Sequence, residues 1–105
     1  MSSPPTSNGL RIVDESAFGC RVRVVSIQVE SPSVSLIAGS SVAWSFDDLA
    51  KMGFQEGAAC WVTVDIEGGQ TNLATPIKFI LVNFGPTLTW VLTGTDAAPS
   101  WEGPS

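Results

Sequence analysis

The sequence predicts an all-β domain, a small barrel or sandwich of six to seven mostly antiparallel strands with one short helix at about residues 46–52. Three observations lead to this fold class. Apolar and polar residues alternate along much of the chain, which is the period of a half-buried strand. Clusters of glycine, proline and serine interrupt these runs at short intervals. The 105 residues suffice for one core, so we expect a single domain.

The first long alternating run covers residues 20–30 and is predicted to be one strand. Its apolar side chains change phase at residues 24–25, which indicates a bulge or a strong bend. Ser-Pro-Ser at 31–33 ends this strand, and residues 34–38 begin the next one.

A third strand is predicted over residues 41–46, and it leads directly into the helix. Ser45 can cap the helix N-terminus, and Asp48, three positions later, completes a capping box. Gly53 then suits the left-handed position that follows the last helical turn. A helix of about two turns must be held by packing rather than by propensity.

In the second half of the chain, apolar and polar residues alternate most clearly at residues 58–67, which are predicted to form a strand. Gly68-Gly69 supplies the turn that follows it. Residues 76–84 are almost continuously apolar, which favours a strand buried on both faces. A turn then leads into a strand over residues 87–95. The ends differ in composition, so we expect an N-terminal arm at 1–9, one β domain at 10–96 and a C-terminal arm at 97–105.

The composition excludes several kinds of chemistry. The chain has no histidine and no tyrosine and only two cysteines, so we expect neither an enzyme nor a metal site or other cofactor. Five Lys and Arg against ten Asp and Glu argue against nucleic acid and anionic membranes as partners. The hydrophobic share of 44% with only 14% charged residues leaves apolar surface to spare, so we expect a homo-oligomer.

The first residues, MSSPPTSNG, have neither the basic nor the apolar region of a signal peptide. The longest apolar stretch, residues 79–82, is far too short to span a bilayer. These features favour a soluble intracellular (cytoplasmic) protein. A viral particle component and a mature secreted chain remain alternatives.

Both cysteines fall on predicted strands among aliphatic neighbours. A disulfide between Cys20 and Cys60 is one alternative, and two buried thiols are the other and the preferred one.

Candidate ligand-binding residues lie on the polar faces of the strands. Trp61 shares its face with Thr63, and an exposed tryptophan can stack on a sugar or anchor an interface. Thr63 is also predicted to share a face with a row of threonines at 87, 89 and 93, which forms either a solvated face or a hydroxyl lining. Trp101, in the C-terminal arm, is predicted to be an interface residue.

The segment SFDDLAKMGFQEGAACWVTV, residues 45–64, resembles part of the TOBE/Mop family of small oligobindin barrels. The shared features are a short helix, a glycine-containing turn at residues 52–57 and a strand. The resemblance implies a barrel whose short polar residues hold an oxyanion between subunits, and at matching positions these residues are Ser45 and Ser41.

Two functions follow as expectations. The first is a non-enzymatic, self-associating module that binds a small polar ligand, an oxyanion or a sugar, through Ser41, Ser45, Trp61 and Thr63. The alternative is a structural assembly protein, a coat- or decoration-type subunit, whose proline-rich arms contact neighbours.

Overall fold

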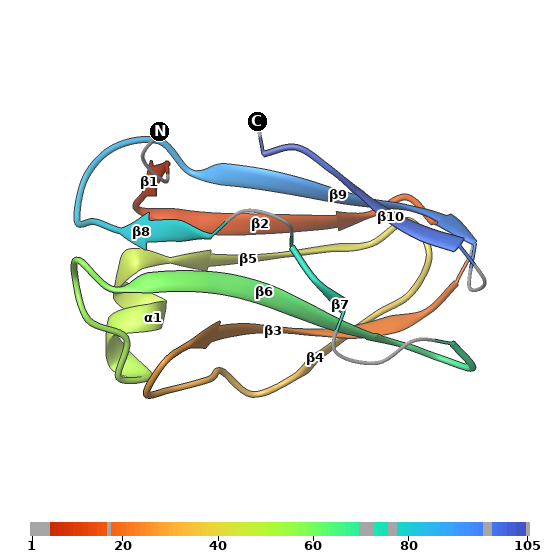
Figure 1. Cartoon of the computed structure of the whole chain (residues 1–105), viewed down its shortest axis with the longest axis horizontal. Helices are drawn as coiled ribbons and strands as arrows, with labels where there is room; N and C mark the ends of the chain where they lie inside the picture. The colour runs from red at the N-terminus through yellow and green to blue at the C-terminus, as the bar shows by residue number, and fades with distance from the viewer. Residues whose placement is uncertain (1–4, 17, 70–72, 76–77, 96–97, 105) are drawn as a thin grey trace.

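The chain folds into two β-sheets packed face to face, with one helix at one end of the sandwich (Figure 1). A computed structural model describes residues 5–16, 18–69, 73–75, 78–95 and 98–104. Both sheets have open edges, so the sandwich form of the predicted fold class is the one adopted and the barrel is not closed. Of the ten strands in the described residues, six are at least five residues long.

Sheet A has the strand order β1-β8-β6-β3-β4, with β7 also paired to β6. Its centre is the antiparallel pair β3 and β6, and β1 joins β8 in parallel. The strands are β1 (Thr6–Ser7), β3 (Cys20–Ser26), β4 (Val34–Leu36), β6 (Ala59–Ile66), β7 (Leu73–Ala74) and β8 (Phe79–Leu81).

Sheet B has the order β10-β9-β2-β5. The central strands β2 and β9 run parallel, whereas the edge strands β5 and β10 pair antiparallel with them. The strands are β2 (Gly9–Asp14), β5 (Ser41–Ser45), β9 (Leu88–Thr95) and β10 (Ala98–Glu102).

The core lies between the two sheets and follows the alternation of the sequence. On β6 the even-numbered residues 60–66 are buried, and on β9 Leu88, Trp90 and Leu92 are buried. Because successive side chains of a strand point to opposite faces, the odd-numbered residues of β6 form the outer face of sheet A.

The helix α1 (Phe46–Lys51) confirms the predicted capping box. The Ser45 hydroxyl accepts a hydrogen bond from the Asp48 N–H (3.1 Å), and the Asp48 carboxylate accepts one from the Ser45 N–H (3.0 Å). These bonds, with a smaller contribution from Lys51, hold the pKa of Asp48 below its usual range. Leu49 fixes the helix to the core, and Gly53 follows it with a φ of 104°.

Replacing Ser45 with alanine is expected to lower the free energy of unfolding by about 1 kcal/mol, because the Asp48 N–H loses the hydroxyl that caps it. Urea unfolding monitored by circular dichroism measures this change. Ser35→Ala, at an exposed position of β4, is the matched control and should change stability by less than about 0.5 kcal/mol. Equal effects of the two substitutions would contradict the capping role.

The chain turns within residues 20–30, so the prediction of one strand over this range was wrong, and of the two predicted causes of the phase change the structure shows a bend. β3 ends at Ser26, and the Ser26 N–H donates to the Val29 carbonyl (2.7 Å). Val25 and Glu30 form an antiparallel bridge, so the chain reverses at residues 26–29. Ile27 is at the tip and is 86% exposed.

The apolar run at 76–84 contains a shorter strand than predicted. Of the described residues in this run, Phe79–Leu81 form the strand, and Phe84 lies in the following loop with 75% of its surface exposed. Residues 76–77 lie outside the described part of the chain. Periodicity cannot locate the ends of a continuous apolar run, which is why the prediction extended too far.

The structure also differs from the predicted arms. Thr6, Ser7 and Gly9 belong to strands of the sandwich, and Ala98–Glu102 pairs with β9 along its whole length. The Trp101 and Trp90 rings meet edge to face, with centroids 6.0 Å apart. Backbone pairing and this ring contact place residues 98–102 on their own domain.

Candidate functional site

The structure separates the four predicted ligand-binding residues into two groups. Trp61 and Thr63 lie on β6, in the middle of the outer face of sheet A. Ser41 and Ser45 lie on β5, at the edge of sheet B, and the Ser45 hydroxyl is already engaged in capping α1. The four residues therefore do not form one site.

Charged side chains surround Trp61 and Thr63 on this face. The register of β3 and β6 places Val25 opposite Trp61, Arg23 opposite Thr63 and Arg21 opposite Asp65. Lys78 also lies here, over the Trp61 ring, so three of the five cationic side chains of the chain are on this face of a protein with a net charge of −5. We call this surface the Trp61 face; it comprises Arg21, Arg23, Trp61, Thr63, Asp65 and Lys78.

The Trp61 ring is half-buried and has a cation above it. The Lys78 ammonium lies 4.7 Å from the centroid of the indole ring. Such a contact at an exposed position contributes about 0.5–1 kcal/mol, so the lysine can be displaced from the ring at modest cost. A planar partner can then reach one face of the indole.

Arg23 is held in place beside this ring. Its Nη1 lies 3.5 Å from Asp65 Oδ2, and its Nε lies 3.7 Å from Glu30 Oε2. Both carboxylates are near the guanidinium, so the Trp61 face contains fixed donors and acceptors rather than uncompensated positive charge.

Thr63 places a buried hydroxyl on this face. The residue is only 8% exposed, and its hydroxyl has no hydrogen-bond partner within the described residues. Buried hydroxyls normally have a partner, so a bound water or ligand is expected there. Thr89 and Thr93 lie on sheet B, so the predicted grouping of Thr63 with that row was wrong.

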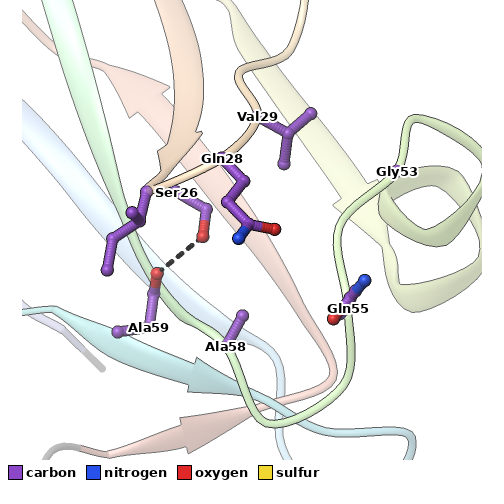
Figure 2. A pocket seen from close by; sticks show the side chains of 8 residues that line it. Ser26, Gln28, Val29, Gly53, Gln55, Ala58 and Ala59 are labelled. Atoms are coloured by element: carbon purple, nitrogen blue, oxygen red, sulfur yellow. Dashed lines mark hydrogen bonds between the residues drawn. The ribbon is translucent and has the colours of Figure 1, made fainter.

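A cavity of about 230 Å³ lies at one end of the sandwich, between the turn at 26–29 and the segment 53–59. Figure 2 shows the Gln28 side chain extending toward this segment, with the Ser26 hydroxyl donating to the Ala59 carbonyl (3.0 Å). None of the predicted ligand-binding residues lines it. The lining residues are Ser26, Ile27, Gln28, Val29, Gly53, Gln55, Ala58 and Ala59.

A buried carboxylate at the opposite end was not singled out from the sequence. Asp14 is fully buried, and its Oδ1 accepts hydrogen bonds from the Ser16 N–H (2.9 Å) and the Ser16 hydroxyl. Its Oδ2 lies 3.7 Å from the Cys20 sulfur. The backbone of Asp14 also bonds to Gly39 and Ser40, so this residue joins the β2–β3 and β4–β5 connections.

The two cysteines are free and buried, which excludes the disulfide alternative in this structure. Cys20 lies opposite Ile66 and Cys60 lies opposite Ser26, at the two ends of the β3–β6 pair. Burial, together with the charge and hydrogen bonding of Asp14, raises the pKa of Cys20 to about 12. Burial raises the pKa of Cys60 to about 11.

These raised pKa values predict a loss of stability at alkaline pH. The thiols ionise near pH 9 when the chain is unfolded, but only at about 11 and 12 when it is folded. The contribution of the two thiols to the free energy of unfolding is therefore fully present below pH 9. Above pH 9, ionisation of each thiol in the unfolded chain lowers this free energy by up to about 1.4 kcal/mol per pH unit.

Comparison with a Cys20→Ala/Cys60→Ala variant isolates this effect, since its packing loss does not depend on pH. Urea unfolding of both proteins between pH 8 and pH 11, the window set by the lower of the two folded pKa values, should show a steeper fall for the wild type. Parallel pH profiles would contradict the assignment.

Two negative findings concern the described residues only. No group of three or more Asp, Glu or Cys side chains in them is placed to hold a metal ion. No helix among them has the length and apolar character needed to cross a membrane.

Comparison with known proteins gives no match to a family model, a curated protein or a solved structure. The fold and the Trp61 face define the class of protein as a small open β-sandwich with an aromatic and charged outer face. Residues 45–64 do form a helix, a turn and a strand, and their resemblance to the TOBE/Mop family stays a prediction.

Proposed function

We propose that this protein is a non-enzymatic binding module that holds a sugar on the Trp61 face. The observation that carries the proposal is the half-buried indole beside a buried hydroxyl without a partner in the described residues. A sugar has an apolar C–H face that packs on an aromatic ring and a rim of hydroxyls that hydrogen-bond to polar side chains.

The neighbouring side chains suit both kinds of contact. Arg23 donates hydrogen bonds, Asp65 accepts them, and the Thr63 hydroxyl does both. Lys78 must leave the indole face when a sugar stacks there, and its ammonium can then pair with a carboxylate on the ligand. This favours a uronic acid over a neutral hexose.

A bare oxyanion fits this face less well than a sugar. The Arg23 guanidinium already lies near the carboxylates of Asp65 and Glu30, which would repel an anion placed at this arginine, whereas the carboxylate of a uronic acid is expected to pair with Lys78. An oxyanion also leaves the Trp61 ring without a role. We therefore favour the sugar among the two expected ligands.

Calorimetric titration with neutral and uronic-acid oligosaccharides, and separately with molybdate and sulfate, tests the proposal. We expect binding of at least one oligosaccharide, and Trp61→Ala should weaken it at least tenfold, or about 1.4 kcal/mol. Trp101→Phe is the matched control and should leave affinity unchanged. Absence of oligosaccharide binding, or equal affinity of the Trp61→Ala variant, would overturn it.

The alternative function, an assembly subunit whose arms reach neighbouring copies, loses the support of residues 98–102. These residues occupy the edge of their own sheet, with Trp101 packed on Trp90.

A further inference from the structure

We infer that two copies of this chain dock through the end of the sandwich that carries the cavity, with Ile27 of each copy seated in the cavity of the other. The turn at 26–29 presents Ile27 to solvent with 86% of its surface exposed. A large aliphatic side chain at the tip of a tight turn gains nothing for the fold from this exposure. It is therefore available for an intermolecular contact.

The cavity has a size and lining that suit this side chain. Its volume is about 230 Å³, and a cavity of roughly 150 Å³ already holds benzene. Val29, Ala58 and Ala59 supply apolar contacts, the exposed Gln55 side chain lies at one side, and the Gln28 carboxamide reaches into the cavity (Figure 2). None of the described residues that line it is charged, so an aliphatic side chain can enter without burying an ion among them.

The position of Ile27 relative to the cavity points to a second copy rather than to another partner. In a twofold dimer the same surface must supply both halves of each contact. Ile27 lies beside the cavity and is itself one of its lining residues. A rotation axis between two such ends brings each Ile27 toward the opposite cavity, giving two equivalent contacts.

The charge distribution agrees with this choice. Each chain carries a net charge of −5, so two copies repel each other except where the facing surfaces are uncharged. Two carboxylates lie nearby among the described residues: Glu56 accepts a hydrogen bond from the Asn83 N–H (3.2 Å), and Glu30, next to Val29, lies 3.7 Å from the Arg23 guanidinium.

A neighbouring loop enlarges the apolar surface. Phe84 is 75% exposed and follows Asn83, and the Gly57 N–H donates to the Leu81 carbonyl (2.7 Å), which ties this loop to the segment 53–59. Figure 1 shows all three at the end that carries α1, with the β8–β9 loop at the top, the turn at the bottom and the segment 53–59 between them. The contact area remains small, so a weak dimer is expected.

Sedimentation equilibrium between about 10 µM and 1 mM tests the inference. We expect a dimer with a dissociation constant below about 1 mM, which Ile27→Asp raises at least tenfold. Ile37→Asp is the matched control, because Ile37 is 75% exposed at the opposite end of the molecule. The inference would be overturned if the wild type is a monomer at 1 mM, or if its dimer does not depend on Ile27. Equal effects of the two variants on the dissociation constant would also overturn it.

A complementation experiment tests the mutual seating and distinguishes the second copy from another partner. Ile27→Ala removes the inserted side chain, and Ala58→Leu fills the cavity. Each variant should be monomeric, with circular dichroism confirming that it is folded. Their mixture keeps one intact contact, so it should dimerise more than either variant does. A mixture that associates no more than its components would contradict the seating.

Discussion

Replacing Asp14 with alanine is expected to lower the free energy of unfolding by about 3 kcal/mol. The fully buried carboxylate satisfies the N–H and hydroxyl of Ser16, and removing it leaves both groups without that partner inside the fold. The change also leaves space beside the buried Cys20 thiol. Urea unfolding monitored by tryptophan fluorescence measures the loss.

Asp47→Ala is the matched control for this substitution. Asp47 is an exposed carboxylate in the first turn of α1, so its removal should cost less than about 1 kcal/mol. If the two alanine substitutions destabilise the protein equally, the buried hydrogen bonds of Asp14 are not the source of the effect.

Removing residues 96–105 is expected to lower the free energy of unfolding by about 3–5 kcal/mol. The deletion takes away β10, uncovers the edge of β9 and removes the Trp101 ring from Trp90. Burial of an aromatic side chain and an edge-to-face ring pair together contribute about 2–4 kcal/mol, and the strand adds its backbone hydrogen bonds. Thermal and urea unfolding of the truncated chain measure the change.

Trp101→Phe serves as the control for the truncation. The Trp101 indole N–H has no hydrogen-bond partner among the described residues, so phenylalanine keeps the ring contact and loses no bond there. We expect a change below about 1 kcal/mol. A truncated chain as stable as the full one would show that residues 98–102 do not belong to the folded unit.

Local patterns predicted the parts of the fold that depend on neighbouring residues. The capping box of α1 needs only Ser45 and Asp48, three positions apart, and it forms as expected. The alternation at 58–67 and 87–95 placed the buried side chains of β6 and β9 on the correct face. In each case the local pattern and the tertiary packing favour the same structure.

Features set by contacts between distant residues could not be predicted in this way. The turn at 26–29 has the same alternation as a strand, and no glycine or asparagine marks it. The serine- and proline-rich ends have the composition of arms, yet residues 6–7, 9 and 98–102 within them pair with β8, β5 and β9. The parallel pair of β2 and β9 joins segments almost eighty residues apart in the chain.

Only the part of the candidate site that depends on local alternation could be predicted from the sequence. The period of two placed Trp61 and Thr63 on one face of a strand. The charged residues around them come from β3 and from Lys78, and only the sheet register and folding bring these together. Ser41 and Ser45, which the family resemblance implies as ligand-binding residues, lie on the other sheet.

The most direct test of the account is nuclear magnetic resonance of the four tryptophan indole N–H groups during titration with a uronic-acid oligosaccharide. Single Trp→Phe variants assign the signals. Trp44 and Trp90 are buried in the core, whereas Trp61 and Trp101 are half-buried on different sheets. A sugar stacked on the Trp61 face predicts a saturable shift of the Trp61 signal with the other three unchanged. A Trp61 signal that stays fixed while another indole shifts, or no shift at any of the four, would contradict it.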